Sequence, residues 1–583
     1  MEYNLNIEQR SSTAAAFKKM LGFMKGERWH LFFALFVMLL NSGISMLTPY
    51  LIGYTIDHYI VTKIYSGLIT YSGILFGLYL VSAVTDYFQT KLMGSIGQRM
   101  LYSLRNEVFN RIQSLPVAFF NENKAGDLIS RINTDTDKVN QFFSQSLMQF
   151  VDSIFTMAGA AAFLLSIQLN LGGAALFPAI FILIFVKIIT PFVKKKNAAS
   201  VKSTGGLSAE IQEGLSNFKS IVAFNRRGYF RNSFEVANQL NFKNSVSAGL
   251  INTVFIPVFT FFSNIAQLIV LAFGIYLISQ GNFTIGLLIS FIAYTQYFYQ
   301  PLRQIASLWA NFQTAMASWD RISVILNLQS NLAQIPDTSA SQPNAPLLQF
   351  KNVSFQYPGG KKVLHHINFE LEKGKTYAFV GPTGGGKTTT ASLIARLYDP
   401  SEGEVLLEGK NLQSYSNEER SKKIGFILQD PFLFNGTVKE NILYGNEEYK
   451  KMADSEFETY LNSIGLHELM RGFENGLDTK IMAGGESMSL GEKQLLAFVR
   501  AILRKPALLI LDEATANIDT VTEKLLATII EKLPSSTTKV IIAHRLNTIQ
   551  NADEIFFINT GEVSNAGTFD NAIELLMAGK RES

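Results

Sequence analysis

The chain has 583 residues, so by length alone about three or four domains are expected. Its composition is 48% hydrophobic with 46 Phe and 21 Tyr but only 17% charged, which indicates that part of the chain lies in lipid. The absence of cysteine excludes disulfides, thiolate metal sites and thiol nucleophiles, and a formal net charge of +4 is too small for this length to indicate nucleic acid. The six His show no HExxH or similar spacing, so no zinc site is expected.

The N-terminal segment, residues 1–28, is expected to remain on the cytoplasmic side. Its first twenty residues are polar and hold no short apolar core with a small-residue cleavage site, so no removable signal peptide is expected. From Phe17 to Arg28, apolar side chains recur at helical spacing among basic ones. This pattern predicts a short amphipathic helix on the membrane surface, and a solvated cap is the alternative.

Six apolar stretches follow, each long enough to cross a bilayer, which requires about twenty residues. Basic residues concentrate before the first stretch and after the second and fourth, while the short turns after the third and fifth carry no charge. Because basic residues favour the cytoplasmic side, both termini are predicted to be cytoplasmic. Residues 29–328 are thus predicted to form a six-span transmembrane domain, with spans near residues 29–53, 66–86, 146–169, 171–193, 250–280 and 283–303.

The two cytoplasmic connections are long and keep a helical apolar period, so the spans are predicted to continue as helices beyond the membrane. Each connection is interrupted in the middle, the first at Leu115-Pro116 and the second between Ile221 and Phe230. Short elements at the tips of such extensions are placed to touch a cytoplasmic domain, and loops without contacts are the alternative.

Polar groups in the spans are candidate ligands for a transported compound. Asp86, Asp152, Lys187 and Arg303 lie about 24 to 30 Å along the helix from the outer ends of their spans, near the inner interface, where charged side chains reach water at low cost. The last two spans combine amide, tyrosine and phenylalanine side chains, a lining that suits bulky amphipathic ligands. Ordinary helix packing is the alternative for most of these polar residues, which are Asn252, Asn264, Gln267, Tyr294, Gln296, Tyr297, Tyr299 and Gln300.

Residues 329–346 shift to Gln, Asn, Ser, Ala and Pro and are predicted to be a linker. Residues 347–583 are predicted to be a soluble α/β domain that begins with the strand pattern LLQFKNVSFQYP. Tyr357 ends this strand, and its ring would either stack on an adenine or be an ordinary aromatic residue of an edge strand.

The sequence GPTGGGKTT follows the apolar run Tyr377–Val380 and precedes a segment with helical apolar spacing. A strand, a glycine loop and a helix in this order let consecutive backbone N–H groups turn inward on a polyphosphate. Lys387 would then reach the outer phosphates, and the Thr388 hydroxyl would ligate Mg²⁺. The predicted nucleotide-binding residues of this loop are Gly381, Pro382, Thr383, Gly384, Gly385, Gly386, Lys387, Thr388 and Thr389.

Four further elements supply the remaining groups that phosphoryl transfer requires. The apolar strand in ALLILDE ends in two carboxylates, of which Asp512 would hold Mg²⁺ and Glu513 would accept a proton from the attacking water. Gln429 follows another apolar strand and would sense both the metal and the water, and His544 follows the strand KVIIA and would bind a γ-phosphate. Ser489-Leu490-Gly491 opens a helix whose N-terminus favours an anion, with plain helix capping as the alternative.

In order and spacing, these motifs together with Asp519 resemble the nucleotide-binding domain of ATP-binding cassette (ABC) transporters. With six spans ahead of it, the whole chain resembles a half-transporter of the exporter type. The resemblance implies a multidomain membrane protein, in which a six-helix transmembrane domain of the ABC exporter type is followed by an α/β P-loop NTPase cassette.

The resemblance implies that two such chains pair and form the ATP sites between them. Two ATP molecules with Mg²⁺ would lie between two cassettes, each held by the phosphate loop of one chain and by the signature residues Ser489 and Gly491 of the other. Tyr357 would stack on adenine, Gln429 would couple the metal to the membrane helices, and Glu513 with His544 and Lys387 would carry out hydrolysis. The segments around Phe119-Phe120 and from Phe224 to Phe230 resemble the two coupling helices of the family, and the second is expected to cross to the partner's cassette.

Two positions depart from the family pattern. Where the signature usually reads Leu-Ser-Gly-Gly-Gln, this chain has Met488-Ser489-Leu490-Gly491-Glu492. Glu492 places a carboxylate near bound phosphates, a repulsion of about a few kcal/mol, so either Glu492 turns away or that ATP site is impaired. Combined with an intact Glu513 and His544, this mixture resembles heterodimeric multidrug exporters, and a heterodimer is slightly favoured over a homodimer. The second departure is Asn225-Arg226-Arg227 in the second coupling segment, where acidic residues are more usual.

The expected function is ATP-driven export of amphipathic or hydrophobic compounds across the cytoplasmic (inner) membrane. The expected partners are a second half-transporter, membrane lipid and an amphipathic small molecule, without nucleic acid. The first alternative is a lipid or lipid-linked glycan flippase, for which Lys187 and Arg303 are the basic candidates in the spans. A regulator that binds ATP without transport is a second alternative. An importer is less expected, because importers usually carry their spans and cassette on separate chains.

Overall fold

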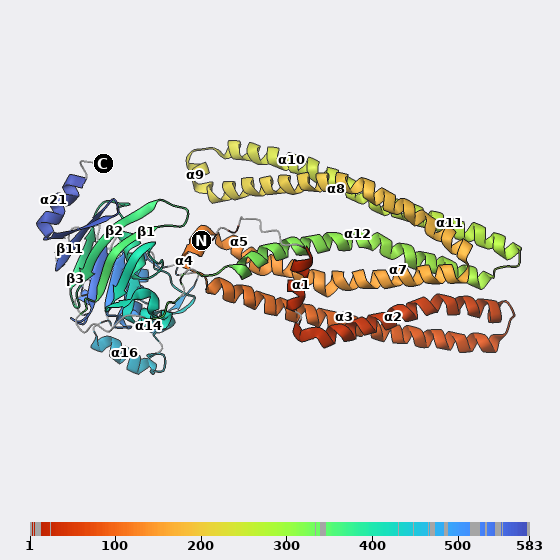
Figure 1. The fold of residues 1–583 in the computed structure, drawn as a ribbon, viewed down its shortest axis with the longest axis horizontal. Helices are drawn as coiled ribbons and strands as arrows, with labels where there is room; N and C mark the ends of the chain where they lie inside the picture. Colours follow the sequence, from red (N-terminus) through yellow and green to blue (C-terminus); the bar gives the residue numbers. More distant parts are fainter. Residues whose placement is uncertain are drawn as a thin grey trace. The chain divides into compact units, whose positions relative to one another are not determined.

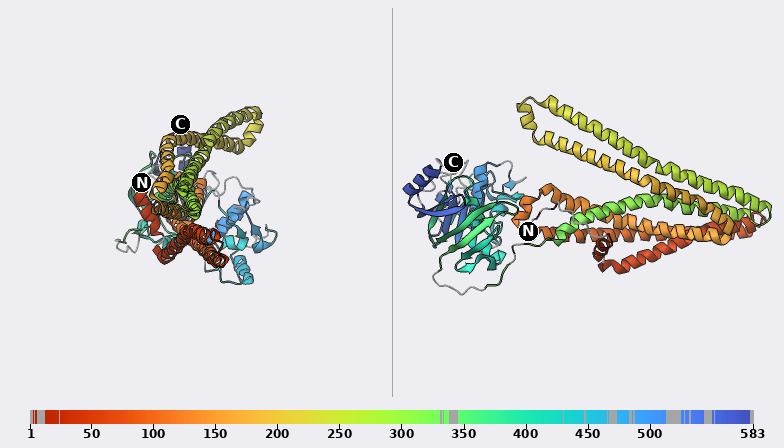
Figure 2. Two further views of the ribbon diagram at one scale, coloured as in Figure 1. Left: turned by 90° about the vertical axis from the view of Figure 1, so that its right-hand side faces the viewer. Right: turned by 45° about the horizontal axis from the view of Figure 1, so that its top comes forward.

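The chain, seen here as a computed structural model, divides by its contacts into two units, which Figures 1 and 2 show with their elements in chain order. One unit comprises Ile7–Ile112 and Gly126–Asn327 and is helical, while the other comprises Met1–Asn6, Gln113–Ala125 and Leu328–Ser583 and contains every described strand. The structure describes residues 13–23, 25–330, 334–337, 345–429, 431–446, 448–464, 473–482, 488–512, 528–530, 533–542 and 552–579, and positions 3, 5, 332, 466, 485, 525, 526 and 550.

Six long helices of the helical unit contain the predicted spans. They are α2 (Arg28–Thr55), α3 (Tyr65–Gln113), α7 (Leu147–Ile167), α8 (Leu169–Ser216), α11 (Phe255–Ser279) and α12 (Ile285–Asn327). Within the part of the chain that the structure describes, five continuous helical stretches are long and apolar enough to cross a membrane: Arg28–Ile60, Tyr65–Gln113, Ala125–Ile167, Leu169–Ser216 and Arg227–Ser279.

Helix α12 carries the sixth predicted span but does not reach the same apolar character, because tyrosines and glutamines such as Gln296 and Gln300 interrupt its apolar run. It nevertheless packs against α2, α7 and α11. The six-helix arrangement therefore includes α12, although only five of the six helices are apolar enough to be recognised as spans by composition.

Two tyrosines of α12 that were candidate ligands for a transported compound are instead used in helix packing. Tyr294 is fully buried and donates its hydroxyl proton to the Met46 carbonyl of α2 at 2.6 Å. Tyr299 donates to the Ala175 carbonyl of α8 at 2.9 Å. A buried hydroxyl that already has its acceptor contributes to the bundle, so ordinary packing is the better account of both residues.

The N-terminal helix and both predicted breaks are present, with shifted bounds. Helix α1 (Thr13–Gly22) is followed by a 3₁₀ turn, so it begins and ends earlier than the predicted amphipathic stretch from Phe17 to Arg28. Its Ala16 and Met20 are buried while Lys18 and Lys19 are exposed, as expected for an amphipathic helix. The short helix α4 (Val117–Glu122) follows α3, and α9 (Phe218–Ala223) lies between α8 and α10 (Arg227–Thr253).

Helices α8 and α10 run side by side as an arm that diverges from α7 and α12 toward α9 (Figures 1 and 2). Among the residues that the structure describes, few apolar side chains cover the arm, and its large apolar side chains remain exposed. Those at least 63% exposed are Val201, Leu215, Phe224, Tyr229, Phe242 and Leu250. An unpartnered apolar surface of this extent is typical of a protein interface.

The cassette contains a six-stranded sheet of order β12-β11-β3-β10-β9-β6, a four-stranded antiparallel sheet of order β2-β1-β4-β5, and the pair β7-β8. In the six-stranded sheet all neighbouring pairs are parallel except β11 with β12. The strands are β1 (Leu348–Gln356), β2 (Lys362–Leu371), β3 (Thr376–Val380), β4 (Glu402–Leu407), β5 (Lys410–Asn411), β6 (Ile424–Ile427), β7 (Gly436–Thr437), β8 (Lys480–Ile481), β9 (Leu508–Asp512), β10 (Thr538–Ile542), β11 (Glu554–Asn559) and β12 (Glu562–Gly567).

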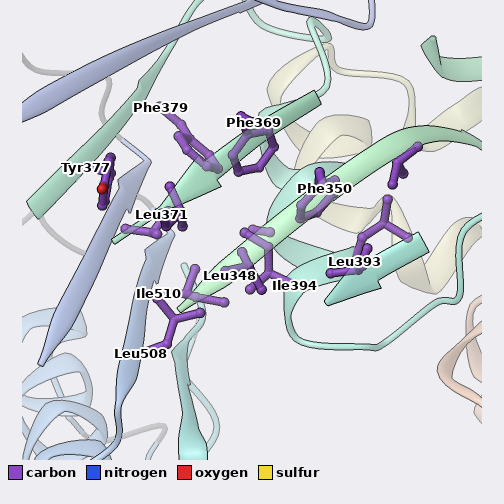
Figure 3. Close-up of a cluster of buried hydrophobic side chains, with 14 of the residues drawn as sticks. Leu348, Phe350, Phe369, Leu371, Tyr377, Phe379, Leu393, Ile394, Leu508 and Ile510 are labelled. Carbon is purple, nitrogen blue, oxygen red and sulfur yellow. The ribbon is translucent and has the colours of Figure 1, made fainter. Parts of the chain in front are cut away.

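A single apolar cluster joins the two larger sheets to α13 (Lys387–Ile394), as Figure 3 shows. Phe350 of β1 stacks on Phe369 of β2 with ring centroids 4.4 Å apart, and Phe369 meets Phe379 of β3 edge to face at 5.7 Å. Leu393 and Ile394 of α13 are buried in the same cluster. The loop between β3 and α13 is therefore held at both ends by one packed core.

A second cluster packs further described helices of the cassette on the other side of β9. Its helices are α15 (Val438–Ile442), α16 (Asp454–Ser463) and α18 (Leu490–Ile502), while α14 (Asn417–Lys423) precedes β6 and α21 (Phe569–Gly579) packs on β11 and β12.

One buried carboxylate fixes the segment before α7 to the C-terminal part of α12. Asp135 is only 1% exposed, and it accepts hydrogen bonds from Ser318 Oγ at 3.0 Å and from Arg321 Nε at 2.8 Å. Removing the arginine would leave a buried charge without its counterion, which typically costs about 3–5 kcal/mol.

We predict that Arg321→Met lowers the thermal unfolding midpoint of the purified chain in detergent by several degrees at a fixed scan rate, because Asp135 would remain charged in a buried position. Arg105→Met is the matched control. Its partner Asp137 is 57% exposed, so the loss should be at most about 1 kcal/mol. Equal shifts for the two variants would contradict a structural role for the buried pair.

Candidate active site

The carboxyl ends of four neighbouring parallel strands meet at one edge of the six-stranded sheet. Ile542 of β10 pairs with Phe379 of β3 on one side and with Asp512 of β9 on the other, and Ile427 of β6 pairs with Leu511 of β9. The glycine loop follows β3, Asp512 ends β9, and Gln429 comes just after β6. Three predicted site elements are thus brought to the edge where open α/β sheets bind ligands.

Two predicted residues of this edge, Glu513 directly after β9 and His544 just after β10, lie outside the described residues, as does Asp519. In the sequence, Glu513 and His544 follow the described ends of β9 and β10. The roles of all three residues remain predictions.

Glycine is required at both ends of the loop. Gly381 has a φ of 145°, and a Cβ there would lie 2.0 Å from the Ile558 carbonyl oxygen. Gly386 has a φ of 117° at the N-cap of α13, where a Cβ would lie 2.7 Å from Leu364 Cδ2. Side chains other than hydrogen are thus excluded by strain and by contact, and the loop closes tightly onto the N-terminus of α13. Between these ends, Pro382, Thr383 and Gly384 are exposed and Gly385 is buried.

Lys387 lies over the loop that precedes it. Its side chain is buried, and Nζ donates to the carbonyl oxygens of Gly381 and Pro382, both at 2.9 Å. The neighbouring Thr388 is exposed, whereas Thr389 is buried. A cationic amine, the N–H groups of a helix N-terminus and an exposed hydroxyl are therefore collected within three residues, which is a donor set suited to a polyphosphate.

Tyr357 lies beside this loop. Its hydroxyl and the Thr389 hydroxyl share a hydrogen bond at 3.0 Å, and its ring meets those of Phe355 and Tyr398 edge to face at 4.9 Å and 5.2 Å. The ring is half-buried. The Tyr357 hydroxyl is anchored to the phosphate loop through Thr389, so the ring is held beside that loop. This placement is compatible with the predicted stacking on adenine.

Asp512 and Gln429 occupy the neighbouring strand ends in different ways. Asp512 is only 5% exposed, whereas Gln429 is exposed and its backbone carbonyl accepts a 3.4 Å hydrogen bond from Gln494 Nε2 of α18. Arg500 of α18 donates to the Phe432 carbonyl at 3.1 Å, so the stretch after Gln429 is held against the signature helix at two points. Sequence reasoning missed this link, because nothing local in the sequence pairs the two segments.

The signature residues form a capping box. Ser489 is the N-cap of α18, and its Oγ accepts from the Glu492 backbone N–H at 3.2 Å. The Glu492 carboxylate turns back and accepts from the Ser489 N–H at 2.7 Å and from the Ser489 hydroxyl at 2.9 Å. Gly491 is buried in the first turn. The spacing Ser-x-x-Glu is a known signal for this arrangement, and it could have been read from the sequence.

The first predicted coupling segment, α4, belongs to the same compact unit as the cassette. Asn121 Nδ2 donates to the Tyr398 hydroxyl at 2.8 Å, and burial raises the pKa of Tyr398, so the hydroxyl stays neutral. Phe119 is buried and meets Tyr3 edge to face at 6.3 Å. Since Tyr398 also packs on Tyr357, a continuous set of side chains joins α4 to the phosphate loop.

The residues present fit a nucleotide with a divalent cation. Lys387 and the loop N–H groups suit the phosphates, while the Thr388 hydroxyl and the Asp512 carboxylate are the oxygen ligands that Mg²⁺ takes together with phosphate oxygens. Among the residues that the structure describes, no group of three or more His, Asp or Glu side chains forms a self-sufficient metal site.

Comparisons with known proteins match both parts of the chain. Residues 31–302 match the family described as "ABC transporter transmembrane region", and residues 364–516 match the family described as "ABC transporter". The chain is 32% identical over 563 residues to "Uncharacterized ABC transporter ATP-binding protein YfiC" of Bacillus subtilis, which covers 96% of this chain and 92% of that protein.

Two further relatives carry more specific names. A "Fatty acid ABC transporter ATP-binding/permease protein" of Mycobacterium bovis is 32% identical over 86% of this chain and 78% of its own length. A "Probable multidrug resistance ABC transporter ATP-binding/permease protein YheH" of Bacillus subtilis is 31% identical over 86% of this chain and 74% of its own length.

Among solved structures, that of a bacterial Atm1-family ABC exporter with ATP bound is similar, with a TM-score of 0.78 and 23% identity over 95% of this chain and 96% of that one. This similarity shows the fold. The chain therefore belongs to the ABC transporter family and is a half-transporter of the exporter type, with a transmembrane region and an ATP-binding cassette fused in one polypeptide.

Proposed function

We propose that this chain is one half of a dimeric exporter that uses ATP hydrolysis to move amphipathic or hydrophobic compounds out across the cytoplasmic membrane, with both termini in the cytoplasm. The observation that carries the proposal is the gathering of the phosphate loop, Asp512 and Gln429 at one sheet edge, in a chain whose other unit contains membrane-spanning helices. The names of two relatives, a fatty acid transporter and a probable multidrug resistance transporter, support a hydrophobic cargo.

The chemistry assigned to the site divides among the strand ends. The backbone N–H groups of residues 381–389 and Lys387 orient the phosphates, with Tyr357 on the adenine. Thr388 and Asp512, with Gln429 nearby, would hold Mg²⁺, which would supply charge neutralisation of the phosphate oxygens. Glu513 takes the proton from the attacking water, and His544 binds the γ-phosphate.

Pairing with a second half-transporter is supported by the arm of α8 and α10. Its exposed apolar side chains, including Leu215, Phe224 and Phe242, require a protein cover that the described part of this chain does not supply. The tip of this arm, from α9 to Phe230, is the proposed contact with the partner's cassette. Arg226 and Arg227 at this tip are exposed, so an acidic receiving surface would match them in charge.

Glu492 would make the two ATP sites of a heterodimer differ in how tightly they bind phosphate. Its carboxylate accepts the same Ser489 N–H and hydroxyl that the signature would offer to a phosphate in the partner's site. Phosphate binding must then displace Glu492 from these donors, and its negative charge remains close by. This competition weakens the site that receives this chain's signature and supports a heterodimer over a homodimer.

We predict that Glu513→Gln lowers ATP turnover of the assembled transporter in lipid by about 10²–10⁴-fold, because the general base is lost while the shape of the side chain is kept. The measurement is steady-state ATP hydrolysis, with and without amphipathic dyes and fatty acids. Wild type should be stimulated by such compounds. Glu562→Gln on the exposed face of β12 is the matched control and should retain full activity.

The same assay separates the alternatives. Stimulation by one lipid or lipid-linked glycan, but by none of the dyes or fatty acids, would point to a flippase. No turnover in any pairing, with ATP still bound, would point to a regulator and would contradict export.

A further prediction concerns the signature. Glu492→Gln keeps the capping box, since glutamine also satisfies it, but removes the charge. The KM for ATP should fall by about three- to tenfold, because screening by solvent and salt leaves about 1 kcal/mol of the repulsion between the Glu492 carboxylate, held back by Ser489, and phosphate.

Glu419→Gln is the matched control for this change, because Ser416 and Glu419 form the same capping box at the start of α14, away from the sheet edge. An unchanged KM in the Glu492 variant, or an equal change in both variants, would show that the charge of Glu492 does not oppose phosphate binding.

A further inference from the structure

Two of the first residues of the chain are bound to the first predicted coupling segment. Tyr3 is fully buried and Leu5 is only 6% exposed, although both precede the first helix. They belong to the same compact unit as residues 113–125, which contain α4, and as the chain from Leu328 onward. Neither the proposed ATP site nor the proposed contact with a partner chain uses them.

Helix α4 is too short to hold its position alone. It has six residues, and isolated helices shorter than about 12 residues are marginal in water. Its N-cap is Pro116, and no side chain caps its N-terminus. The position of α4 therefore depends on tertiary contacts. Those contacts include Tyr398 of the cassette and, from a distant part of the sequence, Tyr3 and Leu5.

Two side chains at the end of α4 bind the backbone of Tyr3 and Leu5. The Glu122 carboxylate accepts from the Tyr3 N–H at 2.9 Å. Asn123 Nδ2 donates to the Tyr3 carbonyl at 2.9 Å and to the Phe119 carbonyl of α4 at 2.8 Å. Asn123 Oδ1 accepts from the Leu5 N–H at 3.3 Å. Because both amide hydrogens and the amide oxygen are used, Asn123 joins the last turn of α4 to these two residues in one fixed geometry.

The Tyr3 side chain lies between α4 and the start of the linker. Its ring meets the ring of Phe119 edge to face at 6.3 Å, and Phe119 is itself fully buried. Its hydroxyl donates to the Gln329 carbonyl at 3.3 Å, two residues after the end of α12. A buried aromatic ring is a stronger anchor than a hydrogen bond of this length, so the ring supplies most of the attachment.

The linker is fastened to the cassette a few residues later. The Ile335 N–H donates to the Gln413 carbonyl at 3.1 Å, and Asp337 pairs with Lys410 of β5 at 3.1 Å. Tyr3 thus contacts two later segments through which the chain passes between its two units, namely the segment that contains α4 and the start of the linker.

We propose that Tyr3 is a positioning residue that clamps α4 to the start of the linker. Helix α4 is then held from two directions, by the bond from Asn121 to Tyr398 and by the contacts of Tyr3. The last step of this inference rests on the proposed export function, in which α4 transmits the state of the cassette to the spans. Loss of the clamp uncouples ATP turnover from the transported compound while the ATP site stays intact.

The first test measures the clamp itself and does not depend on export. Hydrogen–deuterium exchange of the purified full-length protein in lipid nanodiscs is followed by mass spectrometry for residues 117–123. Tyr3→Ala should speed this exchange by at least about fivefold, whereas Tyr3→Phe, which keeps the ring, should speed it by about twofold or less. If Tyr3→Ala does not fold, Glu122→Ala removes the acceptor of the Tyr3 N–H at an exposed position and should speed exchange about threefold.

Two control variants calibrate this measurement. Asn121→Ala removes the bond to Tyr398 and should also speed the exchange of α4, which shows that a lost contact is detected. Tyr102→Phe makes the same chemical change as Tyr3→Phe at a side chain of α3 that is 72% exposed, and it should leave the exchange unchanged. Wild-type exchange of α4 in both Tyr3→Ala and Glu122→Ala would overturn the proposal.

The second test is steady-state ATP hydrolysis by the assembled transporter. In Tyr3→Ala, the KM for ATP and the unstimulated turnover should stay within about twofold of wild type, whereas stimulation by amphipathic compounds should fall to about half or less. A purely stabilising residue would instead lower turnover in the same proportion with and without the compound. Unchanged stimulation despite faster exchange of α4 would overturn the role in coupling. Absence of stimulation in the wild type would contradict the proposed function, and the exchange experiment would still decide the clamp.

Discussion

The parallel register of β3, β10, β9 and β6 is the constraint on which the cassette depends. It places the glycine loop, Asp512 and Gln429 along one edge, although they are distant in sequence. The aromatic cluster around Phe350, Phe369 and Phe379 fixes β3 from one side, and Leu393 and Ile394 fix α13. A loop held between two packed elements can keep its N–H groups oriented without help from a ligand, and this preorganisation is what phosphate binding requires.

In the helical unit, polar side chains that lie among apolar ones need hydrogen-bond partners within the bundle. Ser290, Tyr294 and Tyr299 of α12 meet this need by donating to carbonyls of neighbouring helices. The arm of α8 and α10 leaves apolar side chains exposed well beyond the predicted spans. A half-transporter that pairs through such an arm would couple two chains mechanically, and the contact of Asn121 with Tyr398 gives each chain a connection from α4 to its own phosphate loop.

Prediction from the sequence was accurate wherever a pattern is local. The loop GPTGGGKTT, the apolar strand that ends at Asp512, the six predicted spans and both helix breaks all coincide with elements of the structure, and five of the spans are also apolar enough to cross a membrane by composition. The span in α12 is the least apolar of the six, because Tyr294 and Tyr299 bond to neighbouring helices and the exposed Gln296 and Gln300 interrupt its apolar run. The predicted roles of Glu513 and His544 fall on residues that the structure does not describe.

The contacts that sequence reasoning missed are those that join distant segments. No local rule pairs Gln494 with Gln429, Asn121 with Tyr398, or Tyr3 with Phe119. Glu492 is a different case, because Ser-x-x-Glu is a local signal that predicts the capping box, whereas the expectation for Glu492 rested on repulsion of phosphate alone. The structure shows that the Glu492 carboxylate is bonded to Ser489, so a phosphate must displace this carboxylate before it can bind the Ser489 N–H and hydroxyl.

The most direct test of the central claim is uptake of a fluorescent fatty acid or a fluorescent cationic dye into inside-out membrane vesicles that contain this chain, alone and with candidate partner chains. The account predicts uptake that requires hydrolysable ATP and disappears with a non-hydrolysable analogue. Uptake that proceeds without ATP, or no uptake of either probe in any pairing that hydrolyses ATP, would contradict export of amphipathic compounds by this transporter.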